Sequence, residues 1–190
     1  MTKIYSKQDP GALKEVVKAL RNGEVIIYPT DTLYGLGCDA TNAESVRKLF
    51  DIKKRDENKP ISIILPSLEL VNQYAYTTEL VKEIFQNSTE PTTVVLESKG
   101  NLPKVLTANN NSIAVRIPKQ SFSLDLAKNF KLPITATSAN ISGKKFISFE
   151  KMIEDFPEIC LAIRDTDIEN HTEPSTIVDA RSEKLIFLRK

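Results

Sequence analysis

The sequence predicts an α/β protein with one three-layer domain over residues 1–190, in which helices flank a mixed sheet of parallel and antiparallel strands. Two observations support this fold class. Apolar runs of strand length alternate along the chain with amphipathic segments of helical period. The chain of 190 residues is also long enough for one sizeable core, and no repeat, low-complexity tract or linker marks a domain boundary.

The predicted helices are marked by apolar residues at helical spacing and by residues that cap their ends. Four apolar side chains between residues 13 and 20 share one face of a helix that Gly23 ends as its C-terminal cap. A second helix is predicted over residues 42–54, because Thr41 and Glu44 have the spacing of a capping box. Further helices are predicted over residues 68–74, 78–85, 122–130 and 149–156.

The predicted strands are short apolar runs bounded by turn residues. They cover residues 24–28, 61–65, 92–97, 112–117, 133–137, 160–164, 175–180 and 185–189. The early strands alternate with helices, which favours parallel pairing, whereas the short turns between the last strands favour hairpins.

Composition and charge limit the classes of function. Hydrophobic residues make up 41% and charged residues 27% of the chain, as in ordinary soluble globular proteins. The formal net charge of +1 provides no global field toward nucleic acid or membrane. The N-terminus lacks the apolar core of a signal peptide, and no stretch reaches the roughly 18 apolar residues of a membrane span. We therefore expect a cytoplasmic protein without membrane contact.

Metal-ligating and nucleophilic residues are few and scattered. Cys38 and Cys160 fit no C-x-x-C pattern and indicate packing roles in a reducing compartment, and His171 is the only histidine. We expect no protein-bound transition metal. No Ser/His/Asp or Cys/His set points to a covalent enzyme nucleophile.

The first predicted strand is followed by a polar segment, within "YPTDTLYGLGCDATN". Thr30, Asp31 and Thr32 supply short hydrogen-bonding side chains, while Gly35 and Gly37 permit a positive φ or a close approach of the backbone. Open α/β sheets bind ligands at such strand ends. The segment either binds a ligand or forms a turn that caps the next helix.

Two common nucleotide-binding motifs fit poorly. "GLGCDA" matches G-x-G-x-x-[GA], but six residues separate it from the strand and Ala40 fills the third glycine position. "SGKK" at residues 142–145 lacks the first glycine and the final Ser or Thr of a Walker loop.

Cations gather near the first polar segment. Lys53, Arg55 and Lys59 can converge on whatever that segment binds, whereas Lys54 is expected to face solvent at the helix end. Arg116 lies in an otherwise apolar strand, so its charge must find a partner.

Two further strand ends offer hydrogen-bond donors. Ser138, Asn140, Ser142 and Gly143 follow one strand and form either a cradle for phosphate or carboxylate or the entry of a helix. Ser175 adds a hydroxyl near the start of a later strand. Acidic residues are rare at these strand ends, which favours an anionic ligand.

Five segments carry a resemblance to a known family. In order they are "YPTDTLYGLGCDATN", "IKKRDENKP", "AVRIP", "TSANISG" and "EPSTIVD". Together they resemble the YrdC-type threonylcarbamoyl-AMP synthase family in its short, TsaC-like form, from about residue 9 to residue 189. The resemblance implies a twisted mixed sheet flanked by helices, with a positively charged cavity.

The function that this resemblance implies is an ATP-dependent nucleotidyltransferase. It would condense L-threonine, bicarbonate or carbon dioxide, and ATP to threonylcarbamoyl-AMP and pyrophosphate, for the threonylcarbamoyladenosine modification of tRNA. Mg²⁺ would arrive with the ATP, and no protein residue is named as a metal ligand. Downstream tRNA threonylcarbamoyl-transferase proteins are the implied partners, and direct contact with tRNA is left open.

The resemblance also implies residue roles. The family signature pairs K-x-R with S-x-N, which gives the catalytic set Lys53, Arg55, Ser138 and Asn140. The residues implied for L-threonine are Thr32, Arg116 and Ser175. Those implied for ATP are Arg55, Lys59, Ser112, Ser138, Asn140 and Arg189. The chain departs from the family pattern at Asp56 and after Arg189.

Two alternative functions remain open at this point. One is a carbamoyl-adenylate-forming relative, whose domain normally belongs to a much larger protein. The other is a module that binds double-stranded RNA or tRNA. For such a module we expect the affinity for RNA to fall steeply as the salt concentration rises.

Overall fold

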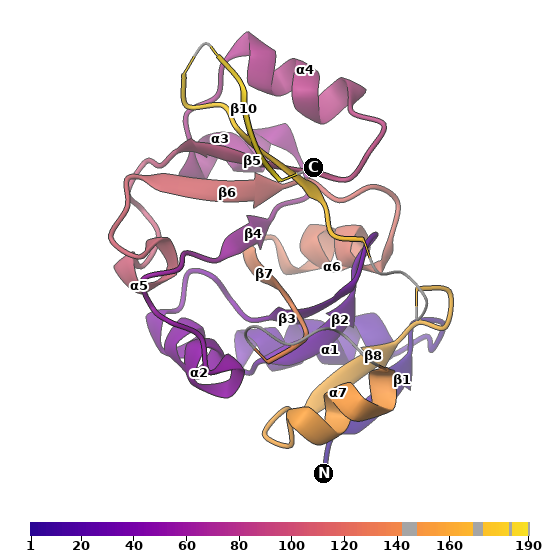
Figure 1. Cartoon of the computed structure of the whole chain (residues 1–190). Helices are drawn as coiled ribbons and strands as arrows, with labels where there is room; N and C mark the ends of the chain where they lie inside the picture. Colours follow the sequence, from indigo (N-terminus) through magenta and orange to yellow (C-terminus); the bar gives the residue numbers. More distant parts are fainter. Residues whose placement is uncertain (142–147, 169–172, 183, 190) are drawn as a thin grey trace.

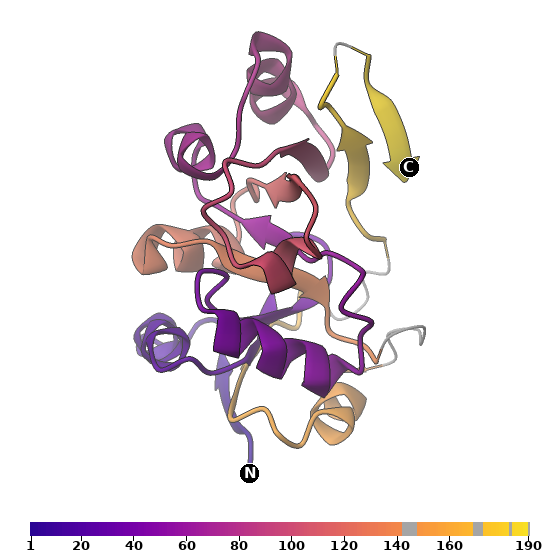
Figure 2. The same ribbon diagram turned by 90° about the vertical axis from the view of Figure 1, so that its left-hand side faces the viewer.

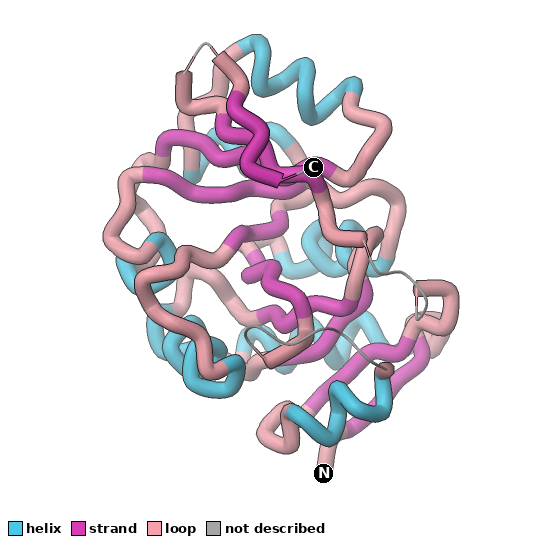
Figure 3. The backbone as a smooth tube through the Cα atoms, viewed as in Figure 1, coloured by secondary structure: helices cyan, strands magenta, loops and turns pink. Residues whose placement is uncertain are grey.

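One mixed sheet runs through the part of the chain that this computed structural model describes, residues 1–141, 148–168, 173–182 and 184–189 (Figures 1 and 3). Its ten strands lie in the order β1-β8-β2-β3-β7-β4-β6-β5-β9-β10. The strands are β1 (Lys3–Ser6), β2 (Ile26–Pro29), β3 (Tyr34–Gly37), β4 (Ser62–Ile64), β5 (Thr92–Glu97), β6 (Ser112–Arg116), β7 (Ile134–Ser138), β8 (Leu161–Arg164), β9 (Thr176–Asp179) and β10 (Ile186–Arg189). The predicted α/β fold with a mixed sheet is confirmed.

Strand pairing follows the predictions in part. The β9–β10 hairpin forms as expected, and Figure 2 shows it at one end of the sheet, apart from helices α3 and α4. Parallel pairs join β8 to β1 and β2, β4 to β6, and β5 to β9. The antiparallel hairpin of β2 and β3 differs from the prediction, because the polar, glycine-containing segment over residues 30–37 has the composition of a loop.

Helices cover both faces of the sheet, which gives the three layers. They are α1 (Ala12–Arg21), α2 (Ala43–Lys53), α3 (Leu68–Tyr74), α4 (Glu79–Asn87), α5 (Lys104–Thr107), α6 (Phe122–Phe130) and α7 (Phe149–Asp155). In β2, Ile26 and Tyr28 pack in one core cluster with α1 and α6, whereas Ile27 packs in the other with α2. Alternate residues of a strand face opposite sides, so the two clusters lie on opposite faces.

The glycines of β3 have a packing role. Gly37 carries no positive φ, and a Cβ added to it would lie 2.5 Å from Cε1 of the Tyr28 ring. Gly35 is under the same ring, at 3.2 Å. The sequence predicted either a positive φ or a close approach of the backbone for these glycines. The structure shows the close approach, and the group that approaches is the Tyr28 ring.

The caps of the first two helices differ in how well they were predicted. The C-cap of α1 is Asn22, and Gly23 follows it with φ +76°, the left-handed conformation that ends many helices. The N-cap of α2 is Asn42, whose Oδ1 accepts from the backbone N–H groups of Glu44 and Ser45. The capping box predicted from Thr41 is therefore wrong, because the Thr41 hydroxyl donates to Asp39 instead. No helix within the described ranges is long and apolar enough to cross a membrane.

Candidate active site

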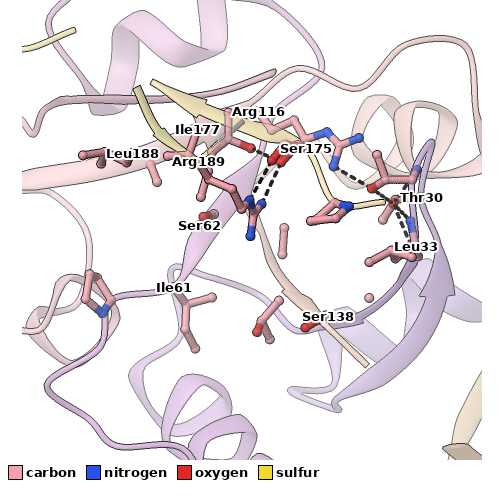
Figure 4. A pocket seen from close by; sticks show the side chains of 18 of the residues that line it. Thr30, Leu33, Ile61, Ser62, Arg116, Ser138, Ser175, Ile177, Leu188 and Arg189 are labelled. Carbon is pink, nitrogen blue, oxygen red and sulfur yellow. Dashed lines mark hydrogen bonds between the residues drawn. The ribbon is translucent and has the colours of Figure 1, made fainter. Parts of the chain in front are cut away.

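A pocket of about 780 Å³ opens on one face of the sheet, between the β2–β3 connection and the β9–β10 hairpin (Figure 4). Small side chains form its floor. Ala136 of β7 pairs with Ser62 of β4, and Ala114 of β6 pairs with Val95 of β5. Because β4 and β6 are neighbours, these residues cross four adjacent strands. The sheet is left hollow where larger side chains would fill the space.

Three arginines from distant parts of the chain line this pocket. Arg55 follows α2, Arg116 ends β6 and Arg189 ends β10, while no Asp or Glu is among the described lining residues. Burial, and next the positive charge of Arg116, lower the pKa of Arg189. Burial also lowers the pKa of Arg55. An anion in the pocket would offset these cations, of which Arg116 and Arg189 repel each other.

Arg116 is the most enclosed of the three, with 6% of its surface exposed. Its Nη1 donates to Thr32 Oγ1 at 2.9 Å, and its Nη2 forms an ion pair with Asp31 Oδ1. The partner that the sequence required for this charge is therefore Asp31. The Arg116 Nε is buried and has no hydrogen-bond partner among the described residues, so one donor of the guanidinium is unsatisfied.

Arg189 is held against the pocket wall by Ser175 (Figure 4). Its Nε donates to the backbone oxygen of Ser175 at 2.9 Å, and its Nη2 reaches Ser175 Oγ at 3.3 Å. Ser175 Oγ also lies 2.9 Å from Thr93 Oγ1. These contacts connect the last strand to Thr93 of β5 and direct the Arg189 guanidinium into the pocket.

Lys53 lies behind the pocket wall, with only 2% of its surface exposed, and does not line the pocket. Its ammonium donates to the backbone oxygens of Ser138 and Asn140, and it reaches Asn140 Oδ1 at 3.3 Å. Burial, and next the charge of Arg55, lower its pKa to about 7. The three oxygen acceptors favour the ammonium form and oppose these two effects. Lys53 thus supports the S-x-N segment from within.

The remaining members of the K-x-R and S-x-N sets face the pocket. Arg55 Nε donates to Lys59 O at 3.1 Å and its Nη2 to Pro60 O at 2.9 Å, which fixes the guanidinium beside the segment leading into β4. Ser138 Oγ donates to Asn140 Oδ1 at 2.5 Å. The polar groups that face the pocket here therefore belong to two short loops that Lys53 and Arg55 hold in place.

Comparison with known proteins identifies the family to which this chain belongs. The model of the Sua5/YciO/YrdC family, described as telomere recombination, matches residues 18–190. The chain belongs to this family. It is 34% identical to the threonylcarbamoyl-AMP synthase of Mus musculus, over 88% of this chain and 62% of that protein. It is 32% identical to the threonylcarbamoyl-AMP synthase of Pseudoalteromonas translucida, over 93% of this chain and 97% of that protein.

A solved structure in the Sua5/YciO/YrdC family extends the comparison to three dimensions. P. abyssi Sua5 complexed with L-threonine matches with a TM-score of 0.84 and 29% identity, over 93% of this chain and 53% of that one. This chain therefore spans about half the length of that protein, and the fold assignment rests on a likeness over nearly all of the present chain.

In this family member, the structure brings most of the predicted site residues to one pocket. Those that line it are Thr32, Arg55, Arg116, Ser138, Asn140, Ser175 and Arg189. Lys59 is exposed, and Ser112 lies at the opposite end of β6 from Arg116; neither lines the pocket. Ser142, Gly143 and His171 lie outside the described residues.

Sequence reasoning left several lining residues out of the site. Thr93 and Val95 occupy alternate positions of β5, as do Ala114 and Arg116 of β6. The available signal was strand alternation: once Arg116 is placed in the pocket, its neighbours two residues away share that face. Thr93 could then have been inferred only with the register of β5 against β6, which sequence alone does not give.

Proposed function

We propose that this chain is an L-threonylcarbamoyladenylate synthase, which joins L-threonine, bicarbonate or carbon dioxide, and the adenylyl group of ATP. The observation that carries the proposal is the enclosed Arg116, whose guanidinium lines the pocket beside the hydroxyl of Thr32. Arg55 and Arg189 supply two further cations in the same pocket. The synthase names of the two curated relatives support the same reaction.

Each substrate is assigned to a part of the pocket by charge. The α-carboxylate of L-threonine would pair with Arg116 and Thr32, with Ser175 near the same wall. The phosphates of ATP would contact Arg55, Ser138, Asn140 and Arg189, because a triphosphate needs several donors on separate loops. The relative crystallised with L-threonine supports an amino acid as one ligand.

The proposed reaction brings anions together. The neutral amine of L-threonine adds to carbon dioxide and loses a proton, which gives a carbamate. A carbamate oxygen then attacks the α-phosphorus of ATP, the bond from that phosphorus to the bridging oxygen breaks, and pyrophosphate leaves. Arginine side chains would offset the repulsion between carbamate and phosphate and stabilise charge that develops on phosphate oxygens. No covalent bond to the protein is needed.

Magnesium enters this proposal as the companion of ATP. No group of three or more His, Cys, Asp or Glu that could hold a metal is found within the described part of the chain, and Asp31 is engaged by Arg116 and the Lys119 N–H. The triphosphate would therefore supply most ligands of Mg²⁺, which neutralises phosphate charge when bound. The chain's own residues orient the substrates.

The test is pyrophosphate release by the purified protein in ATP, Mg²⁺ and bicarbonate, with each amino acid added in turn. We expect release that depends on L-threonine and on bicarbonate and stops when EDTA removes Mg²⁺. Release driven by carbamoyl phosphate without an amino acid would support the carbamoyl-adenylate alternative. A tRNA-binding module would give no release, and its tRNA binding would weaken steeply with salt.

Hand-over of threonylcarbamoyl-AMP to a tRNA-modifying partner is the remaining part of the proposal. The mixed anhydride between carbamate and phosphate is reactive, so a transferase must consume it. Since ATP and tRNA meet in the cytoplasm, we propose that compartment. Adding the tRNA and a candidate transferase to the assay, with detection of the modified nucleoside, tests this step.

A further inference from the structure

The β2–β3 connection contains a hydroxyl that lines the pocket but has no hydrogen-bonding capacity left for a ligand. Thr30 Oγ1 accepts from the backbone N–H groups of Thr32 at 3.1 Å and Leu33 at 3.2 Å, and it donates to Leu33 O at 2.7 Å. A hydroxyl has one proton and two acceptor positions. These contacts therefore saturate the Thr30 side chain within its own turn.

This saturation determines the direction of the neighbouring Thr32 hydroxyl. Thr32 Oγ1 lies 3.0 Å from Thr30 Oγ1 and accepts from Arg116 Nη1 at 2.9 Å. Both acceptor positions of Thr30 are occupied by backbone N–H groups, so the Thr32 proton is not directed to Thr30. Thr32 lines the pocket, and its proton is left to donate to whatever binds there.

We propose that Thr30 is a positioning residue for the amino-acid substrate. It holds the β2–β3 connection so that the Thr32 hydroxyl donates its proton, next to the Arg116 guanidinium, to one oxygen of the substrate α-carboxylate. The inference rests on the proposed function, because it takes the occupant of this corner to be L-threonine. Thr30 acts through Thr32 and makes no hydrogen bond to the substrate itself.

Removal of the Thr30 oxygen tests this role. Thr30→Val keeps the branched shape but frees two backbone N–H groups and leaves the Thr32 hydroxyl without its fixed neighbour. We expect the KM for L-threonine to rise about tenfold or more, as for the loss of a hydrogen bond to a charged group. The KM for ATP should stay close to the wild-type value. Thr30→Ser restores the oxygen and should recover most of the affinity for L-threonine.

A double-mutant cycle shows whether Thr30 works through Thr32. In a Thr32→Val background the proton that Thr30 orients is absent, so Thr30→Val should then cause little further rise in the KM for L-threonine. Additive effects of the two substitutions would overturn the inference. Thr107→Val is the matched control, because Thr107 is also a buried threonine with a hydroxyl bonded to a backbone oxygen but lies away from the pocket.

Binding measured without ATP separates this inference from the proposed function. L-threonine is titrated calorimetrically into each protein. We expect the wild type to bind it, Thr30→Val to bind it more weakly, and Thr30→Ser to bind it almost as tightly as the wild type. If wild type neither binds L-threonine nor releases pyrophosphate with it, the proposed function fails. If wild type does both and folded Thr30→Val matches it, only the role of Thr30 is overturned. Thr30→Ala also removes the hydroxyl oxygen, and it is used in place of Thr30→Val if the valine variant does not fold.

Discussion

The ammonium of Lys53 donates a hydrogen bond to the backbone oxygen of Ser138, which connects the last residue of α2 to the last residue of β7. A second bond, of 2.7 Å, reaches the backbone oxygen of Asn140. Ser138 and Asn140 line the pocket, and Lys53 does not. Lys53 can therefore affect catalysis through the position of this loop and through its charge near Arg55.

Lys53→Met tests that connection, because methionine has a similar length but no donors. The substitution leaves backbone oxygens of Ser138 and Asn140 without their partner in a buried setting. We expect pyrophosphate release to fall by at least about tenfold, which corresponds to about 1.4 kcal/mol. Lys54→Met is the control, since Lys54 is exposed. A Lys53→Met enzyme with the wild-type rate would contradict a role for this clamp.

The pH dependence of stability provides a separate test of Lys53. Its pKa is about 7 in the folded protein, against 10.5 for an ordinary lysine, because burial disfavours the charged form. Between these values the unfolded chain binds more protons, so the free energy of unfolding should rise with pH. Relative to Lys53→Met, the wild type should gain at most about 1.4 kcal/mol per pH unit in this window. Urea unfolding at several pH values measures the difference, and a constant difference across the window would contradict the lowered pKa.

Arg55→Ala removes a guanidinium that lines the pocket and is predicted to contact the phosphates. Losing a contact worth about 1.5–3 kcal/mol should lower turnover roughly 10- to 150-fold if the contact forms in the transition state. Arg55→Lys should recover little, because lysine cannot reproduce the two bonds to the Lys59 and Pro60 oxygens. Arg47→Ala on the exposed side of α2 is the control. Pyrophosphate release by Arg55→Ala at the wild-type rate would count against the assignment.

Most strands and helices and the pocket-facing polar loops are predictable from sequence because they have local signals, whereas β1, β3 and α5 were not predicted. Apolar runs fixed β4, β5 and β6, and helical spacing fixed α3 and α6. Residues 34–37 gave no such signal, since two glycines and a preceding polar turn are typical of a loop. β3 pairs with β2 and β7, and its glycines leave room for the Tyr28 ring, a contact that no local pattern reveals.

The candidate site shows the same division. The residue types predicted an anion pocket, and the arginines do converge. Sequence could not tell that Lys53 would lie behind the wall, because the direction of a side chain at a helix end depends on what packs there. It also gave no reason to pair Arg116 with Asp31, since the two are 85 residues apart and meet through the sheet order.

The fit between Tyr28 and Gly37 leads to a prediction about stability. In Gly37→Ala the new Cβ would lie 2.5 Å from the Tyr28 ring and 3.1 Å from Ile134 Cγ2, so the buried ring or strand β3 must shift. We expect a loss of about 1–3 kcal/mol in the free energy of unfolding, as for other overpacked cores. Gly11→Ala is the control, because a Cβ there meets nothing within 4 Å.

In a Tyr28→Leu background the loss of stability caused by Gly37→Ala should be smaller, because the clashing ring is gone. That background also loses the hydrogen bond from the Tyr28 hydroxyl to Thr135 O. Equal urea midpoints for Gly37→Ala and Gly11→Ala would show that β3 does not require glycine at this position.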